Sequence, residues 1–542
     1  MQSTSEITTF TNEPFTDFST DVNRSAYNAA LAKAEASFPI VCRLSIDGED
    51  SEGGAGTFES TDPSLTSRVV ANCAKGDVSD AQRAMVGAHK AFGEWSKRSA
   101  EDRAEFFFKA ARIMRLRKHD FSAVMTYEVG KSRAEADGDT AEAIDFIEFY
   151  AREALRYART QPITPAPGEH NEMIYIPLGV GAVIPPWNFP LAIMAGMCTA
   201  AIVSGNTVVL KPASESPGIA SMFVDLMKEV GLPAGVLQFC PGGGTEVGNA
   251  LVEHPLTRFI SFTGSAEVGK EIYAKAGKTP DGQIWLKRVV AEMGGKDFMF
   301  IDEDADIDSA VTGAHAAGFG YSGQKCSALS RLILHSKIHD EFIEKYLPLV
   351  EATIVGHPSD EATYVGALIN ESALNGALKG IEEAKSDGNT LLSGGERAGD
   401  DGWFLQPTVF SGVQRKDYIF KTELFAPVIA IHKVESFEEG VEASNDSDYG
   451  LTGSYYGKDE DKIARARVEL HCGNLYLNRK CTGALVGAHP FGGFNLSGTD
   501  SKAGGRDYLL LFMQAKQFHA LSNLAHVTRQ FSSWRLAQKA AD

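Results

Sequence analysis

Three residues of the kinds that acyl chemistry requires occur in distinctive local surroundings in this chain of 542 residues. Cys326 lies in the small, polar segment GQKCS, whereas free cysteines usually pack as small hydrophobic residues. Glu292 follows an apolar run and precedes a Gly-Gly turn, and Asn188 lies in the proline-bounded segment PPWNFP. A thiolate can act as a nucleophile, a carboxylate as a general base, and an amide as a donor to a developing oxyanion. The three residues therefore favour covalent catalysis at a carbonyl carbon.

A lone cysteine is more often structural than catalytic, and the other six cysteines keep that interpretation. They are too sparse and too unevenly spaced for a disulfide framework, and no CxxC pair or Cys/His cluster indicates a metal site. We therefore expect no metal ion and a reducing compartment. Cys326 stands apart because of its polar neighbours and because an acid and an amide of suitable type occur elsewhere in the chain.

The overall composition is that of a globular protein. Hydrophobic residues make up 43% of the chain and charged residues 23%, and the formal net charge is −19. A nucleic-acid-binding protein needs a basic face, so this charge favours a small-molecule substrate. The N-terminus shows no basic region followed by an apolar one, and the longest apolar stretch, 191–203, is too short to span a membrane. We expect a cytoplasmic protein with neither nucleic-acid nor membrane partners.

Strand and helix patterns alternate from residue 205 onwards. Strands are expected at 207–211, 236–240 and 258–262, and helices at 217–230, 245–252 and 266–276. Ser216 is expected to cap the helix 217–230, with Pro217 at its first position and Gly231 ending it. The alternation predicts an α/β protein with a parallel sheet. Before it, residues 79–156 have a helical pattern, and 173–184 alternate as a strand or hairpin would.

Six motifs occur in one order: PWNFP at 186–190, KPASES at 211–216, FTGSAEVG at 262–269, EMGGK at 292–296, GQKCS at 323–327 and ELFAPV at 423–428. In their order and spacing they resemble the motifs of the aldehyde dehydrogenase superfamily, and the likeness extends from residue 50 to residue 515. The resemblance implies an α/β fold with a Rossmann-like cofactor domain, an α/β catalytic domain and a β-hairpin oligomerisation element.

The same resemblance divides the chain into parts. Residues 1–50 are expected to form an N-terminal arm, 51–160 and 180–295 a discontinuous NAD(P)-binding domain, and 296–510 the catalytic domain. Residues 161–179 and 511–542 are expected to form an oligomerisation hairpin and a C-terminal tail. A lone hairpin could not bury the apolar residues of this region, so we expect a homodimer or a higher homo-oligomer.

The resemblance implies NAD as the cofactor and leaves NADP open. The pyrophosphate is expected at the start of the helix that follows Phe262, Thr263, Gly264 and Ser265, because a glycine admits close approach and helix amides suit an anion. Lys211 is implied on the adenosine ribose. Ser214 stands where many NAD-preferring relatives have an acid that accepts from the 2′-hydroxyl. Further cofactor contacts are expected from Pro186, Trp187, Gly244, Gly248, Glu423 and Phe425, with Glu423 on the nicotinamide ribose.

Within the superfamily, the chain resembles the branch that oxidises L-glutamate γ-semialdehyde, the open form of 1-pyrroline-5-carboxylate, to L-glutamate in proline catabolism. Cys326 would form a thiohemiacetal and then a thioester, Asn188 would hold the oxyanion, and Glu292, its pKa raised by burial, would activate water. The Gly-rich run 486–505 resembles that branch's anchor loop, with Gly493, Phe494 and Ser327 holding the substrate carboxylate.

Two further residues are expected at the substrate. Phe189 would pack on the aliphatic chain, and Glu142 resembles an acid facing the substrate amine, although a solvated helix face explains Glu142 equally well. A dehydrogenase of another semialdehyde, such as succinate semialdehyde, is an alternative, and the anchor loop argues against it. A catalytically silent binding protein of the same fold is another, and the joint presence of cysteine, acid and amide argues against that.

Overall fold

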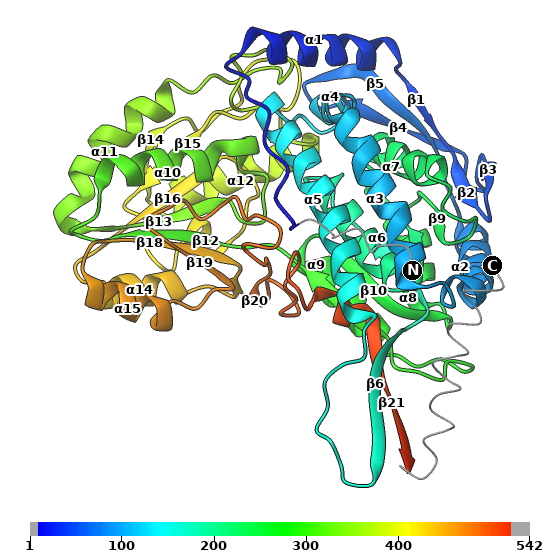
Figure 1. Cartoon of the computed structure of the whole chain (residues 1–542). Coiled ribbons are helices and arrows are strands. Elements are labelled where there is room, and N and C mark those ends of the chain that lie inside the picture. The colour runs from blue at the N-terminus through cyan, green and yellow to red at the C-terminus, as the bar shows by residue number, and fades with distance from the viewer. Residues whose placement is uncertain (1–8, 522–542) are drawn as a thin grey trace.

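The computed structural model describes residues 9–521 as two lobes, each organised around a seven-stranded sheet (Figure 1). The first sheet has the order β11-β10-β7-β8-β9-β2-β3. The first five strands of this order, from β11 to β9, are parallel to one another. Its strands are β2 (Leu44–Ile46), β3 (Glu49–Ser51), β7 (Val180–Ile184), β8 (Thr207–Leu210), β9 (Leu237–Phe239), β10 (Thr257–Thr263) and β11 (Arg288–Glu292). The predicted parallel sheet is confirmed.

The second sheet has the order β14-β15-β16-β13-β12-β18-β19 and is parallel except at β14. Its strands are β12 (Asp297–Ile301), β13 (Leu329–His335), β14 (Thr390–Ser393), β15 (Thr408–Ser411), β16 (Val428–Val434), β18 (Thr452–Tyr456) and β19 (Asn474–Leu477). It is flanked by α10 (Ile307–Phe319), α11 (Ser336–Glu351), α12 (Glu371–Ser386), α14 (Phe437–Asn445) and α15 (Glu460–Glu469). Its central strands are buried, as expected for parallel strands covered on both faces.

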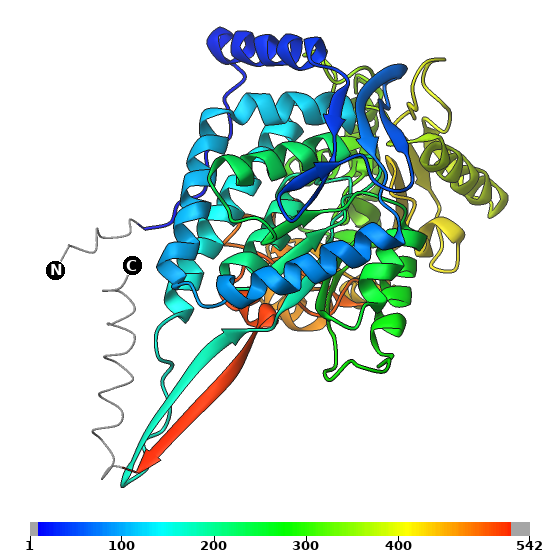
Figure 2. The same cartoon turned by 90° about the vertical axis from the view of Figure 1, so that its right-hand side faces the viewer.

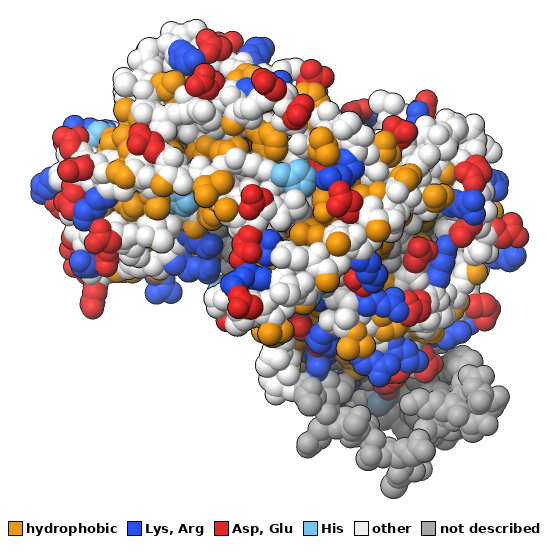
Figure 3. Space-filling model, turned by 90° about the horizontal axis from the view of Figure 1, so that it is seen from above, with side chains coloured by type: hydrophobic (Ala, Val, Ile, Leu, Met, Phe, Trp, Pro, Cys, Tyr) orange, Lys and Arg blue, Asp and Glu red, His pale blue; other side chains and the backbone are white. Residues whose placement is uncertain are grey.

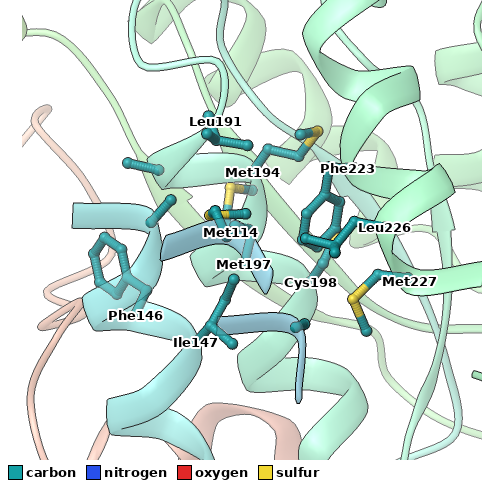
Figure 4. Packing of buried hydrophobic residues seen from close by; sticks show 14 of the residues in the cluster. Met114, Phe146, Ile147, Leu191, Met194, Met197, Cys198, Phe223, Leu226 and Met227 are labelled. Carbon is teal, nitrogen blue, oxygen red and sulfur yellow. The ribbon is translucent and has the colours of Figure 1, made fainter. Parts of the chain in front are cut away.

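Helices cover the first sheet and form the largest core with it. They are α2 (Val78–Trp95), α3 (Ala100–Leu116), α4 (Lys118–Glu128), α5 (Arg133–Tyr157), α6 (Ala192–Val203), α7 (Pro217–Glu229), α8 (Asn249–Glu253) and α9 (Ala266–Ala276). α6 is apolar all round because it lies inside this layer: Met197 and Cys198 pack between Ile147 of α5 and Phe223 of α7 (Figure 4). The apolar stretch noticed in the sequence is therefore a buried helix.

The start of α7 differs from the expectation. Ser216 makes no side-chain capping bond; instead the buried carboxylate of Glu128, at the end of α4, accepts hydrogen bonds from the Gly218 and Ile219 amides at 2.7 and 2.9 Å. An acid from a distant helix thus satisfies the free amides that the sequence assigned to a neighbouring serine. Pro217 does begin the helix, and Gly231, with φ of 84°, follows its end.

The region before residue 50 is more than an arm. Residues 9–20 run along the helical layer, but α1 (Asp21–Ala36), β1 (Ile40–Cys42), β2 and β3 follow. β2 pairs with β9 of the first sheet, and β1 pairs with β5 (Leu65–Ala74), which also pairs with β4 (Thr57–Asp62). Most of this segment is therefore built into the first lobe.

A two-stranded ribbon projects from the first lobe (Figure 2). It joins β6 (Glu169–Pro177) and β21 (Met513–Leu521), which are antiparallel with Ile174 opposite Lys516. The stretch 173–184, expected as one strand or hairpin, is split by Gly179 at φ of 143°: its first part enters the ribbon and its second part is β7. The tail beyond residue 521, like residues 1–8, lies outside the described part of the chain.

The surface of the described residues carries both signs of charge. On the face in Figure 3, acidic and basic side chains are interspersed, without a continuous basic tract. Within residues 9–521, no helix combines the length and the apolar character that crossing a membrane would require.

Candidate active site

The three residues first noted in the sequence are brought together where the two lobes meet. Asn188 follows β7, Glu292 is the last residue of β11, and Cys326 precedes β13. The Asn188 amide donates a hydrogen bond of 3.0 Å to the carbonyl oxygen of Gln324, two residues before Cys326. The charge of the Glu292 carboxylate, after burial and the charge of Asp297, is among the causes that raise the pKa of the Cys326 thiol.

The loop that carries Cys326 has an unusual backbone. Tyr321 and Ser322 both adopt left-handed conformations, with φ of 50° and 56°, which cost free energy in residues other than glycine. Buried hydrogen bonds hold them: the Tyr321 hydroxyl donates to the Val129 carbonyl at 2.8 Å, and the Ser322 hydroxyl to the Gly366 carbonyl at 2.9 Å. The Gln324 side chain accepts from the Ile369 amide at 2.9 Å. The loop is therefore fixed before any substrate arrives.

Cys326 is the one cysteine of the seven that is not fully buried. Burial first, and then the negative charges of Asp297 and Glu292, raise the pKa of its thiol well above the ordinary value. The thiol is therefore protonated in this arrangement at neutral pH, and its proton must leave before the sulfur can attack.

Glu292 has the environment expected of a base. It is 9% exposed, and burial raises the pKa of its carboxyl to about 8, against the opposing effects of the Ser501 hydroxyl and Lys502. The Ser501 hydroxyl donates to Oε1, whereas Oε2 has no hydrogen-bond partner within the described residues. Among the described residues, Oε2 is therefore a buried acceptor without a donor, a cost that a bound water molecule would offset.

The residues expected at the adenosine end of a dinucleotide lie at the carboxyl edge of the first sheet. Lys211, directly after β8, is 6% exposed and its ammonium donates to the Pro212 carbonyl at 3.0 Å. Burial lowers the pKa of this lysine. Ser265 caps α9, accepting from the Val268 amide at 3.4 Å, and remains exposed after Gly264. Ser214 is exposed beyond Lys211.

The glycines expected near the cofactor differ from one another. A methyl group on Gly264 would come within 2.6 Å of the Phe262 ring, so glycine is required there. Gly244 has open space, and a methyl group on Gly248 would make an ordinary contact of 3.7 Å with Lys211. Thr263, the last residue of β10, pairs with Glu292 of β11. Through this strand pairing, the turn expected to bind the cofactor's pyrophosphate lies beside the general base.

The residues expected at the nicotinamide end surround a second buried acid. Glu423 accepts a hydrogen bond of 3.0 Å from the Gly295 amide, and burial raises the pKa of its carboxyl to about 7. Phe425, with φ of 54°, lies edge to face against Trp187 with ring centres 5.6 Å apart. Pro186 precedes Trp187 and is buried. Two chain segments that are distant in sequence are thus joined by an aromatic contact.

These residues fit a nicotinamide dinucleotide. The exposed N-terminus of α9 offers free amides for a pyrophosphate, and Gly264 leaves no side chain in the way. Lys211 is a buried cation whose ammonium donates to the carbonyl of its neighbour Pro212, and an ammonium has three donors, so it has capacity for a ribose hydroxyl. The donor and acceptor set matches sugar hydroxyls and a diphosphate.

A buried lysine packs against Phe189, one of the residues expected to contact the substrate. The Lys131 ammonium is buried 3.9 Å from the ring centre of Phe189 and 4.3 Å from that of Tyr321, and it pairs with Asp139 at 3.2 Å. Neither Lys131 nor Tyr321 was identified from the sequence, because no local pattern marks a lysine that packs on rings from two other segments. Glu142 is half-buried on α5, and burial, then Asp139, raises the pKa of its carboxyl to about 8. The solvated-face interpretation of Glu142 does not match this environment.

The run expected to anchor a substrate carboxylate also contacts the general base and strand β17 (Tyr449–Gly450). The Gly493 amide donates to the Glu292 carboxylate and thereby opposes the rise in its pKa. Phe494 pairs with Gly450 in the short β20–β17 ladder, β20 being Phe494–Asn495, and its ring packs on His471. Ser327 is buried, and its carbonyl oxygen accepts hydrogen bonds from the Thr452 hydroxyl at 3.4 Å and the Cys481 thiol at 3.6 Å.

One group of potential metal ligands occurs within residues 9–521, formed by Asp302, Glu303 and His335. Its two carboxylates are paired with the Lys462 ammonium at 3.0 and 3.1 Å. A lysine therefore neutralises the position that a cation would take.

Comparisons with known proteins agree with this geometry. Residues 50–518 match the aldehyde dehydrogenase family. The chain is 50% identical over 507 residues to 1-pyrroline-5-carboxylate dehydrogenase of Geobacillus thermodenitrificans, covering 94% of this chain and 98% of the relative. It is 49% identical over 508 residues to the protein of that name from Bacillus subtilis, with the same two coverages. A crystal structure of 1-pyrroline-5-carboxylate dehydrogenase from Thermus with bound NAD superposes with a TM-score of 0.93 at 44% identity, covering 95% of this chain and 100% of the other.

The chain belongs to the aldehyde dehydrogenase family. Its fold is that of the family, as the resemblance of the six motifs predicted.

Proposed function

We propose that this protein oxidises L-glutamate γ-semialdehyde, the open form of 1-pyrroline-5-carboxylate, to L-glutamate with NAD, as a step of proline catabolism. The names of relatives that are about half identical over nearly the whole chain support this substrate. The observation that carries the chemistry is the hydrogen bond from Asn188 to Gln324, because it holds an amide donor beside the nucleophile loop.

The first steps use Cys326 and Asn188. The thiol loses its proton and the sulfur attacks the aldehyde carbon, so that a C–S bond forms and the carbonyl oxygen becomes an oxyanion. An amide NH₂ has two donors, and one N–H of Asn188 bonds to Gln324 while the other can bond to this oxyanion. The Cys326 backbone N–H is the second donor.

Hydride acceptance from the carbon that carries the sulfur is the chemistry that a bound nicotinamide would supply. The residues that would hold the dinucleotide are Lys211, Ser214, the Phe262–Ser265 turn with α9, Glu423, and the Trp187–Phe425 pair with Pro186. Gly244 and Gly248 lie in the turn that leads into α8, with Gly248 beside Lys211. Because Ser214 has no carboxylate to repel a 2′-phosphate, we propose only a moderate preference for NAD over NADP.

The last step belongs to Glu292. Its carboxylate takes a proton from water, the resulting hydroxide attacks the thioester carbon, the C–S bond breaks, Cys326 is regenerated as a thiolate, and the carboxylic acid product leaves. Oε2 of Glu292 is buried and, within the described part of the chain, unpaired, so a water molecule admitted to the site would complete its hydrogen bonding. Phe189 and Glu142 are proposed to contact the substrate, and Gly493, Phe494 and Ser327 to hold its carboxylate; the Gly493 amide also donates to Glu292.

Initial rates with glutamate semialdehyde and with succinate semialdehyde, each with NAD and with NADP, test this function. We expect the highest kcat/KM with glutamate semialdehyde and NAD. A higher kcat/KM with succinate semialdehyde would favour the alternative substrate class, and no turnover with either aldehyde would favour a silent binding protein.

We also propose that the protein acts in the cytoplasm as a homodimer or a higher homo-oligomer. All seven cysteines are free, as in a reducing compartment. The β6–β21 ribbon projects from the body with Ile174, Ile176 and Met173 only half-buried, and a two-stranded ribbon is marginally stable alone in water. A second copy of the chain would cover it.

A further inference from the structure

The segment 497–502 lies alongside the end of β11 and reaches the carboxylate of Glu292. The Met293 amide donates to the Ser497 carbonyl at 2.8 Å, and the Thr499 amide donates to the Ala291 carbonyl at 2.9 Å. These two bonds fix the segment on either side of Glu292. Ser501, 3% exposed, then directs its hydroxyl onto Oε1 of the carboxylate.

The two oxygens of this carboxylate are in unequal situations. Oε1 accepts from the Ser501 hydroxyl, whereas Oε2 is buried and has no hydrogen-bond partner within the described residues. A buried carboxylate oxygen without a donor is costly unless a water molecule or a substrate group completes it. The bond from Ser501 to Oε1, together with the Gly493 amide, therefore restricts how the carboxylate is oriented.

We propose that Ser501 is a positioning residue for the general base: its hydroxyl holds one oxygen of the Glu292 carboxylate so that the other receives the proton of the hydrolytic water. This inference rests on the proposed role of Glu292 in thioester hydrolysis. Ser501 lies outside the six motifs, in the Gly-rich run 486–505, where the sequence pattern assigned it no role.

The same bond affects when Glu292 is ionised. A hydrogen bond donated to the charged form favours that form, so Ser501 opposes the rise in pKa that burial causes. The other groups that face this carboxylate from the surrounding elements are Lys502 and Asp500 of the segment, Cys326 of the nucleophile loop, Tyr150 of α5 and Tyr508 of the helical turn Tyr508–Phe512. Of these, Lys502 is the cation, and its ammonium is already bonded to the carbonyls of Gly473 and Gly492.

The test uses the acetyl thioester formed from p-nitrophenyl acetate, which needs neither the cofactor nor the aldehyde. The Cys326 thiolate attacks the ester carbonyl, p-nitrophenolate leaves, and water then hydrolyses the thioester with Glu292 as base. The burst of p-nitrophenolate reports the first step and the steady rate reports the second. A failure of the glutamate semialdehyde proposal therefore leaves this experiment valid.

The variant Ser501→Ala removes a single oxygen atom. We expect the burst amplitude to be unchanged. The rising limb of the plot of steady rate against pH should move to a pH about one unit higher, because a hydrogen bond to the charged carboxylate of Glu292 is lost. At pH 7 that shift lowers the steady rate by about tenfold. Ser501→Thr keeps the hydroxyl and is expected to restore the wild-type limb.

Thr499→Ala is the matched control. Thr499 lies in the same segment and its hydroxyl bonds to the backbone of Ala291 at 3.0 Å, with no bond to Glu292. We expect the steady rate of Thr499→Ala to rise over the same pH range as that of the wild type. If Ser501→Ala keeps the wild-type limb, or if Thr499→Ala shifts it by as much, the hydroxyl does not position the base and the proposal is overturned.

Discussion

The side-chain amide of Asn188 donates a 3.0 Å hydrogen bond to the carbonyl oxygen of Gln324, although the two residues are 136 positions apart. The bond ties the PPWNFP turn to the loop that carries Cys326. It explains why a proline-bounded turn and a loop with two left-handed residues are needed together: each is rigid, so the donor stays beside the nucleophile.

Replacing Asn188 by Ala removes the side-chain donor to the oxyanion. We expect kcat to fall about 10²–10³-fold with a smaller change in KM, because the donor matters most when charge develops on the oxygen. Steady-state kinetics with glutamate semialdehyde measure this. An increase in KM alone would mean that Asn188 binds the ground state and does not stabilise the transition state.

Replacing Cys326 and Glu292 separates the two halves of the reaction. Glu292→Gln should produce a stoichiometric burst of NADH and then stall, because the thioester forms but water is not activated. Cys326→Ala should give no burst. Stopped-flow absorbance at the NADH band distinguishes the two, and normal turnover after the burst in Glu292→Gln would remove Glu292 as the base.

The cofactor preference should depend on residue 214. Ser214→Glu places a carboxylate where the resemblance puts the 2′ position, so we expect kcat/KM with NADP to fall by at least tenfold more than with NAD. Ser214→Gln, of the same size but uncharged, is the control. Equal losses with both cofactors would show that the 2′ position lies elsewhere.

The Glu128 cap should make stability depend on pH. Burial raises the pKa of this carboxyl from 4.5 to about 7, so the folded state holds a proton that the unfolded state releases. Its contribution is therefore fully present below pH 4.5 and is lost as the pH rises through 7. Glu128→Ala should lower the Tm more at pH 5 than at pH 8, as thermal unfolding can measure. An equal loss at both values would show that the carboxyl is not titrating in this range.

The ribbon should control assembly more than catalysis. Deleting residues 516–542 removes the strand residues that pair with Glu169–Ile174, so the exposed β6 edge loses its cover. Light scattering should show a smaller assembly, while kcat stays within about twofold, since the ribbon lies outside the described site. A monomeric mass for the intact chain at micromolar concentration, with full activity, would contradict the proposed oligomer.

The sequence alone determined the fold class and the three central residues, because their signals are local. The helix 266–276 follows from a capping serine and a regular apolar spacing, and the parallel strands follow from short apolar runs between helices. Cys326, Glu292 and Asn188 each lie in a short motif whose residues must be neighbours in the chain to form their turn. The family likewise follows from motif order.

Only the tertiary structure decided contacts between residues that no local pattern connects. Glu128 caps a helix 90 residues away, Ser501 bonds to a carboxylate 209 residues before it, and Lys131 packs on rings from two other segments. The Gly493 amide donates to the carboxylate of Glu292, a contact that the glycine content of its segment cannot reveal. A hydrogen bond requires its partners within about 3 Å, and only the packing of distant segments in the folded chain sets that distance.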